Sequence, residues 1–438
     1  MNPELIGLTF LVLAIMLLCL GIHIGLCLMI AGVLGTFVVT GSFTAAIGIL
    51  RTTPYHTVAS FAFTVIPLFI LMGHFSVHGG ISERAYRAID NWLGKLPGGL
   101  SIATTWGVVA FGATSGSSVA AASAFTKISL PEMKKAGYEP NLACAGIATA
   151  ALIAMIIPPS LYFVIYGMLA EESIARLLIA GFFPGILMAI VLSIGILIVA
   201  SSNPKLAPRS NRLIGWRERM GSTWEAWPML LIAAIIIGGI YTGVFSPTEA
   251  AAVGAFAAFI ICLGYRRLNW GTLKQALFDT AHVTAMLTFV IIGATVFARF
   301  LSISGVTTWM TEAIIGMGLS PLGFVIIILL LIVVMGCFMD GLSIMYITMP
   351  IFFPVVQALG IDPIWFGVLV CVTADLGMIT PPFGLSVYTV KAVAGSDVTL
   401  EGIFRGGLPF YFLILACIAI LVAFPQISLL LPRMMMGR

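Results

Sequence analysis

The chain is 438 residues long; 60% of its residues are hydrophobic, only 9% are charged, and the formal net charge is +4. Soluble proteins carry about 25% charged residues, so this composition excludes an assembly of soluble domains and places the chain in a lipid bilayer. Apolar runs of about 20 residues recur, each long enough to cross the hydrocarbon core as a helix. The sequence therefore predicts an all-α polytopic membrane protein.

Residues 1–200 form a first unit of spans and shorter apolar segments. The polar run 114–118 (Thr-Ser-Gly-Ser-Ser) separates two apolar pieces of about 15 residues, each too short to cross a bilayer alone. Such a pair predicts a re-entrant hairpin, and Pro158-Pro159 breaks the span that follows it. The predicted elements are scaffold spans within 5–78, a surface arm helix 81–95, a hairpin 100–130, a broken helix 142–169 and a span 174–200.

The polar, Arg-rich stretch 201–227 is predicted to be a cytoplasmic linker, and residues 228–438 repeat the plan of the first unit. In this second unit Met339-Asp340-Gly341 forms the tip of the hairpin, and Pro381-Pro382 breaks the next span. The predicted elements are scaffold spans 229–264, an arm helix 266–279, a span 281–303, a hairpin 322–359, a broken helix 364–393 and a closing span 403–424.

The spacing of the two breaks indicates an internal repeat. Gly112 precedes Pro158 by 46 residues, and Gly336 precedes Pro381 by 45. Each unit contains an odd number of crossings, so the second unit must insert upside down relative to the first. Lys and Arg favour cytoplasmic loops, and most of the 21 such residues fall on one side when both termini are placed outside. The sequence thus predicts two inverted-topology repeats with periplasmic or exterior termini.

The two breaks are candidate ion sites. Backbone groups freed from a helix are costly in hydrocarbon and persist where they bind something, cations at half-helix C-termini and anions at N-termini. Ser115, Ser117, Ser118 and Thr380 add hydroxyl oxygens, and such a set with little charge suits a sodium-sized cation. The alternative, in which the proline pairs only kink helices and the small residues only pack, accounts poorly for two breaks at matched spacing.

Other polar residues leave alternatives open. Asp340 and Asp375 are acids in apolar surroundings, so each is either functional or a local cap or pair. His74 and His78 have the i,i+4 spacing of metal ligands, but no third ligand is apparent, and we interpret them as interfacial histidines. Gly116-Ser117-Ser118-Val119-Ala120 departs from the nucleophile elbow at its last residue and lacks an α/β context. The sequence predicts no enzyme.

Five stretches, in order and in both halves, carry a resemblance to a known family. They are Gly112–Ala120, Ile157–Ser160, Ser246–Ala255, Leu359–Gly367 and Leu376–Gly384. With them the chain resembles the large membrane subunit of tripartite ATP-independent periplasmic (TRAP) transporters, bacterial importers of organic acids. The resemblance implies an elevator-type secondary transporter in the bacterial inner membrane, driven by a sodium gradient and using no cofactor apart from sodium ions.

The resemblance also implies where ions and substrate bind. Sodium site 1 would consist of Ser115, Gly116, Ser117, Ser118, Ile157 and Pro158, and sodium site 2 of Gly336, Met339, Asp340, Gly341, Thr380, Pro381 and Pro382. A substrate carboxylate would lie between the hairpin tips, near Ser117, Ser160, Thr380 and Gly384. The family often has Asn and Glu where this chain has Thr373 and Asp375.

The partners implied by the resemblance are a small membrane subunit of four helices and a soluble periplasmic substrate-binding protein. The chain itself is expected to contact the lipid bilayer and an organic-acid substrate, and no nucleic acid. Three rival functions remain: a stand-alone divalent-anion/sodium symporter that needs no binding protein, a proton-coupled carrier with Asp340 or Asp375 as the titrating group, and a membrane subunit without transport of its own.

Overall fold

A computed structural model describes residues 2–209, 215–382 and 384–436, and every regular element in these ranges is helical. The prediction of an all-α membrane protein is confirmed. Six of the described helices are long and apolar enough to cross a membrane, and eight spans result if each of two bent helix pairs counts as one. Parts of the predicted linker (210–214), of the second broken helix (383) and of the C-terminus (437–438) lie outside the described residues.

The first unit contains helices where elements were predicted, and a further helix at 43–58 that was not predicted. Its helices are α1 (Pro3–Cys19), α2 (Ile24–Thr40), α3 (Phe43–Val58), the 3-10 turn η1 (Phe61–Thr64), α4 (Val65–His78), α5 (Ile81–Leu93), α6 (Gly99–Ser115), α7 (Ser118–Lys135), α8 (Pro140–Ile156), α9 (Leu161–Leu169), α10 (Ile174–Ala180) and α11 (Phe182–Ser202). α6 and α7 form the predicted hairpin. α8 and α9 form the predicted broken helix, bent by 47° at the proline pair.

The second unit begins after a linker that itself contains a helix, α12. Its elements are α12 (Trp216–Glu225), α13 (Trp227–Ala233), the π-turn η2 (Ala234–Gly238), α14 (Gly239–Tyr241), α15 (Pro247–Gly264), α16 (Trp270–Ser304), α17 (Val306–Gly316), α18 (Pro321–Gly336), α19 (Gly341–Ala358), α20 (Pro363–Gly377), α21 (Leu385–Ala394), α22 (Leu400–Ala423) and α23 (Gln426–Met436). α18 and α19 form the second hairpin, and α20 and α21 flank the second break.

The separate arm helix predicted for 266–279 is wrong. Its residues from Trp270 onward are the first turns of α16, which continues for 35 residues to Ser304. Asn269 starts this helix, because its side chain accepts the amide of Thr272 at 2.8 Å. The element that precedes the second hairpin, as α5 precedes the first, is instead α17, which the sequence reading did not include; α3 and α23 were also not predicted.

The two broken helices start in the same way, which supports the repeat. Glu139 precedes α8 and accepts the amides of Asn141 at 3.1 Å and Leu142 at 2.6 Å. Asp362 precedes α20 and accepts the corresponding amides of Ile364 and Trp365 at 2.9 and 3.2 Å. A proline occupies the first helical position in both, where its missing N–H costs nothing.

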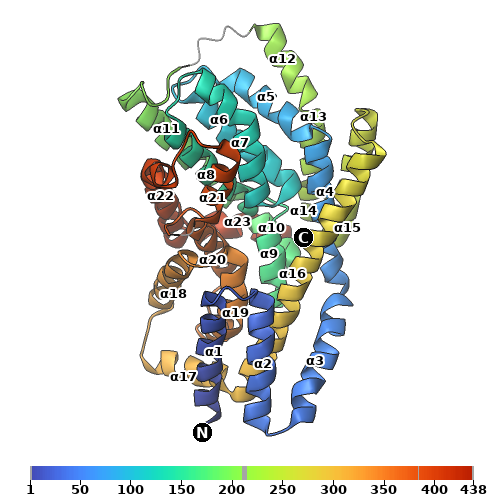
Figure 1. Cartoon of the computed structure of the whole chain (residues 1–438), viewed down its shortest axis with the longest axis vertical. Coiled ribbons are helices and arrows are strands. Elements are labelled where there is room, and N and C mark those ends of the chain that lie inside the picture. Colours follow the sequence, from blue (N-terminus) through green and yellow to red (C-terminus); the bar gives the residue numbers. More distant parts are fainter. Residues whose placement is uncertain (1, 210–214, 383, 437–438) are drawn as a thin grey trace.

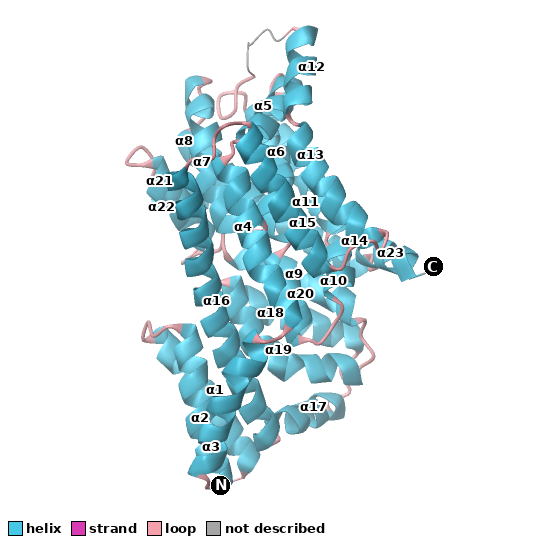
Figure 2. Cartoon of the chain, turned by 90° about the vertical axis from the view of Figure 1, so that its right-hand side faces the viewer, coloured by secondary structure: helices cyan, strands magenta, loops and turns pink. Residues whose placement is uncertain are grey.

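The placement of α5 and α17 agrees with inversion of the two units. Figures 1 and 2 show α5 at the end of the molecule where α12 lies, and α17 at the opposite end, beside the N-terminus. Between these ends, α16 runs along much of the molecule and packs against α2 and α4, while α15 packs against α4. The hairpins and broken helices pack on one another beside this group of helices.

Candidate functional site

In each hairpin, the end of the first helix packs against the broken helix of the same unit. The residues in contact have little or no side chain. A Cβ added to Gly112 of α6 would lie 2.8 Å from the Cα of Ala154 in α8. A Cβ added to Gly336 of α18 would lie 2.6 Å from the Cα of Gly377 in α20. Ala154 and Gly377 each stand four residues before a proline pair. The matched spacing in the sequence therefore corresponds to the same contact between hairpin and broken helix in each of the two units.

The first break frees main-chain carbonyls. Pro158 and Pro159 have no amide proton, so the carbonyls of Ala154 and Met155 lose their usual helical donors. The Ser160 hydroxyl replaces one of them by donating to the Met155 carbonyl. Ser160 also accepts the Phe163 amide at 3.3 Å and so starts α9. None of the hydrogen bonds of the described residues ends on the Ala154 carbonyl, which lies near Gly112 of the hairpin; such an acceptor is expected of a site for a cation.

The tip of the first hairpin meets this break. Gly116 has φ +57° and lies against the carbonyl oxygen of Pro159 so closely that no Cβ would fit. Ser115 is 6% exposed, and its hydroxyl has no hydrogen-bond partner among the described residues. Ser117 is the N-cap of α7 and accepts the Ala120 amide at 3.3 Å. The structure thus places Gly116 of the tip against Pro159 of the break, one residue beyond the predicted Ile157 and Pro158.

At the second hairpin, the acidic residue at the tip caps a helix. Asp340 is the N-cap of α19: it accepts the Ser343 amide at 3.2 Å and also the Ser343 hydroxyl. Gly341 lies directly against the Tyr162 hydroxyl of α9, in the other unit. Met339 and Asp340 are half-buried at this tip.

At the second break the freed carbonyls find partners in their own chain. The Gly377 carbonyl accepts the Thr380 amide and the Met378 carbonyl accepts the Ser386 amide, both at 3.0 Å. The Thr380 hydroxyl donates to the Leu376 carbonyl at 2.9 Å, so its lone pairs remain available to a cation. Both proline pairs contain a cis peptide bond. Pro381 and Pro382 are exposed and Thr380 is 8% exposed.

The two constellations meet at Met378. Its sulfur lies 3.4 Å from the Ser118 hydroxyl of the first hairpin and 3.4 Å from the Tyr162 hydroxyl of α9. Of the four predicted substrate residues, Ser117 lies at the first tip, Ser160 starts α9, Thr380 lies at the second break, and Gly384 starts α21 with φ +49°. The second break therefore contacts the first hairpin and α9 of the first unit through Met378.

Asp375 is the most unusual polar residue near Met378. It is completely buried in α20, and none of the residues that the structure describes gives either of its oxygens a hydrogen bond. Thr373, two residues earlier, is equally buried, and its hydroxyl likewise has no partner among the described residues. A buried carboxylate needs a proton or a cation.

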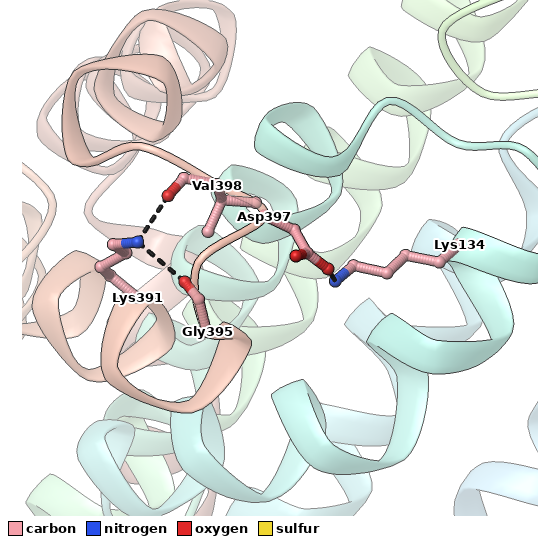
Figure 3. A network of polar contacts seen from close by, with 5 residues as sticks. All are labelled: Lys134, Lys391, Gly395, Asp397 and Val398. Atoms are coloured by element: carbon pink, nitrogen blue, oxygen red, sulfur yellow. Dashed lines mark hydrogen bonds and ion pairs between the residues drawn. The ribbon is translucent and has the colours of Figure 1, made fainter.

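A polar network ties the first hairpin to the segment after α21 (Figure 3). The Lys134 ammonium of α7 lies 2.7 Å from the Asp397 carboxylate. The Lys391 ammonium of α21 donates to the Gly395 and Val398 carbonyls at 2.8 and 2.5 Å. These contacts, with the packing of α21 on α7 and α8, join elements of the two units into one body.

We expect Asp397→Asn to lower the melting temperature by about 1 °C at neutral pH, because exposed ion pairs stabilise little. The hydrogen bond and charge of Lys134 hold the pKa of Asp397 below its ordinary value of 3.8. A depressed carboxylate pKa stabilises the fold above the unfolded pKa, and that contribution disappears as pH falls through the folded value. The difference from wild type should therefore shrink below about pH 4 and in high salt. Glu401→Gln, which breaks an exposed pair within α22, is the control.

The sequence reading missed a second polar region, a cavity of about 380 Å³ between α3, α9, α16 and α19. Arg299 of α16 and His56 of α3 line it, together with Tyr346 of α19. Arg299 donates to the hydroxyls of Thr53 at 3.0 Å and Thr52 at 3.3 Å. An arginine inside an otherwise apolar span is a signal that could have found this cavity.

The comparisons with known proteins agree with this geometry. Residues 11–427 match the family described as tripartite ATP-independent periplasmic transporter, DctM component. The chain is 35% identical over 393 residues to a C4-dicarboxylate TRAP transporter large permease protein of Pseudomonas aeruginosa, covering 89% of each chain. It is 33% identical over 422 residues to an isethionate TRAP transporter permease protein of Oleidesulfovibrio alaskensis, covering 94% of this chain and 64% of that one.

A solved structure, the YdaH transporter of Alcanivorax borkumensis, which is described as having an unusual topology, has the same fold. It superimposes with a TM-score of 0.62 at 16% identity, covering 87% of this chain and 89% of the other. The family match extends over nearly all of the chain, and both hairpins and both breaks fall within it. The chain therefore belongs to the DctM component family of the tripartite ATP-independent periplasmic transporters.

Proposed function

We propose that the chain is the transport subunit of a binding-protein-dependent complex that takes up a small organic acid with sodium ions, by an elevator movement. The observation that carries the proposal is the pair of equivalent hairpin-and-break contacts, Gly112 on Ala154 and Gly336 on Gly377. Tyr162 of α9 links them, because its hydroxyl lies against both Gly341 of the second tip and Met378 of the second break. An arrangement of discontinuous helices at a repeat interface is typical of secondary transporters.

Sodium is supported by the chemistry of the first tip. The buried Ser115 hydroxyl has no partner among the described residues, and the nearby Ala154 carbonyl has lost its helical donor. The second site has fewer free groups, because Asp340 caps α19 and the carbonyls of Gly377 and Met378 are hydrogen-bonded. We therefore propose the first site as the better preformed of the two.

The relatives and the site support a small organic anion as the substrate. The two relatives are named for a C4-dicarboxylate and for isethionate, both small organic anions. The amides at the start of α9 and α21 are groups that such an anion would meet. The second relative is named DctMQ, and a small membrane subunit is the partner that we propose for this chain. A soluble periplasmic binding protein completes the complex.

The elevator proposal divides the chain into two bodies. The moving body comprises the hairpins and broken helices, α6–α9 and α18–α21, which the Lys134–Asp397 pair helps to hold together. The fixed body comprises α1, α2 and α15 with α16, and α5 and α17 connect the two bodies at opposite ends of the molecule. Gly73 of α4 leaves room for the first tip, since a Cβ there would lie 3.1 Å from the Cα of Ser115.

Uptake into proteoliposomes tests the proposal. The chain is reconstituted with a small membrane subunit and a periplasmic binding protein, and uptake of labelled C4-dicarboxylate or isethionate is followed. We expect an inward sodium gradient to drive uptake, an equal potassium gradient to drive none, and omission of the binding protein to reduce uptake to background. Undiminished uptake without the binding protein would support a stand-alone symporter instead.

A proton-coupled carrier is the second candidate, and complete burial of the unpartnered Asp375 favours it. If that carboxylate carries the coupling proton, Asp375→Asn removes uptake driven by a pH gradient. If sodium is the coupling ion and Asp375 carries no proton, the variant keeps its sodium dependence and responds to no pH gradient. Asp340→Asn is the comparison variant, because Asp340 already has a structural role as the N-cap of α19.

A further inference from the structure

The last turn of α4 contains a side-chain cluster far in sequence from the hairpin tips. His74 and His78 lie one turn apart on α4, and Asp279 of α16 faces them. One ligand atom from each residue, two imidazole nitrogens and a carboxylate oxygen, lies within 4.8 Å of the other two. All three side chains are half-buried. We propose that these three residues bind a transition metal ion of the zinc class.

The donor set suits such an ion. Imidazole nitrogen is a preferred ligand of Zn²⁺, Cu²⁺ and Ni²⁺, and carboxylate oxygen is a common third ligand. The ligand atoms of a tetrahedral zinc ion lie about 3.3 Å from one another, so small rotations of the side chains close the present spacing. The two rings already lie nearly parallel, with centroids 6.4 Å apart and 24° between their planes. Three protein ligands leave the fourth position to water.

The position of the cluster indicates which helices a bound ion would hold together. His78 is the last residue of α4, and only Gly79 and Gly80, the latter with φ +70°, separate it from α5. A metal ion bridging His78 to Asp279 would hold the end of α4 on α16 beside this two-glycine connection. The ion would thus fix the point from which α5 departs.

In the part of the chain that the structure describes, no hydrogen bond or ion pair occupies the three ligands. The thiol of Cys262 in α15 donates to the Phe75 carbonyl at 2.9 Å. Arg267 lies 3.7 Å from Glu83 of α5 rather than on Asp279. His282, the histidine of α16, is exposed and is not a member of the cluster.

Metal titration of the purified full-length chain tests the inference. The experiment is done in sodium-free buffer, so its outcome is independent of sodium coupling. We expect one Zn²⁺ per chain by calorimetry, a chelator-reversible rise in melting temperature, and the visible absorption of low-coordinate Co²⁺ when Co²⁺ replaces zinc. His74→Gln, His78→Gln and Asp279→Asn should each weaken binding at least tenfold, because each removes a ligand.

Two further variants make the test decisive. His282→Gln leaves the cluster complete and should bind as wild type does. His78→Cys keeps a zinc ligand and should restore most of the affinity lost in His78→Gln, which separates loss of a ligand from misfolding. Less than one equivalent of zinc on wild type, or unchanged affinity in Asp279→Asn, would overturn the proposal.

Discussion

Gly336→Ala should abolish uptake and lower the free energy of unfolding by about 1–3 kcal/mol. The added Cβ would lie 2.6 Å from the Cα of Gly377, a backbone atom that cannot rotate away. The second hairpin would have to separate from the broken helix, and the tip that carries Met339 and Asp340 would move with it. Melting temperature of the purified chain and uptake in proteoliposomes measure the two effects.

The repeat supplies a second variant and the chain supplies a control. Gly112→Ala places its Cβ 2.8 Å from the Cα of Ala154, so it should act like Gly336→Ala at the other tip. Gly264, like Gly336, ends its helix, but nothing lies within 4 Å of a Cβ there. Gly264→Ala should therefore be neutral or stabilising by a few tenths of a kcal/mol, as alanine is the better helix former. Equal effects at positions 336 and 264 would contradict the packing argument.

The hairpins and breaks were predictable because their signals are local. A polar run between two short apolar segments and a proline pair within a span each act through the backbone of their own residues. The same holds for the starts of α8 and α20, where an acid precedes a proline. Local chemistry of this kind can be read from one sequence.

The wrong or missing predictions concern helices whose ends depend on how they pack against distant parts of the chain. The charges of 266–279 suggested a surface helix, but no proline interrupts 270–304 and α16 continues through it. α17 lies between Gly305 and Gly318, both with positive φ, and these glycines could have marked its ends. Asp279 joins His74 and His78 from about 200 residues away, a contact that needs the packing of α4 on α16 and that no local pattern contains.

The second prediction with a large effect concerns the first sodium site. Sodium at one hundred times its Kd should stabilise the folded chain by about 2.7 kcal/mol. In Ser115→Ala we expect that stabilisation to fall by half or more, since a tenfold weaker site retains only about 1.4 kcal/mol at the same concentration. Thermal unfolding with sodium, potassium or choline at constant ionic strength measures the change.

Ser115 is the informative position because its hydroxyl does nothing for the empty fold: it is buried and has no partner among the described residues. Removal of this hydroxyl should leave the stability without sodium unchanged or raise it by about 1 kcal/mol.

Two serine variants are the controls. Ser117→Ala removes the cap of α7, so it should lower stability by about 1 kcal/mol with or without sodium. Ser428 of α23 is an equally buried and unpartnered serine away from both tips, so Ser428→Ala should keep the full sodium response. If Ser115→Ala kept it too, the first tip would not bind sodium, and the second break would be the site to which the sodium response is traced next.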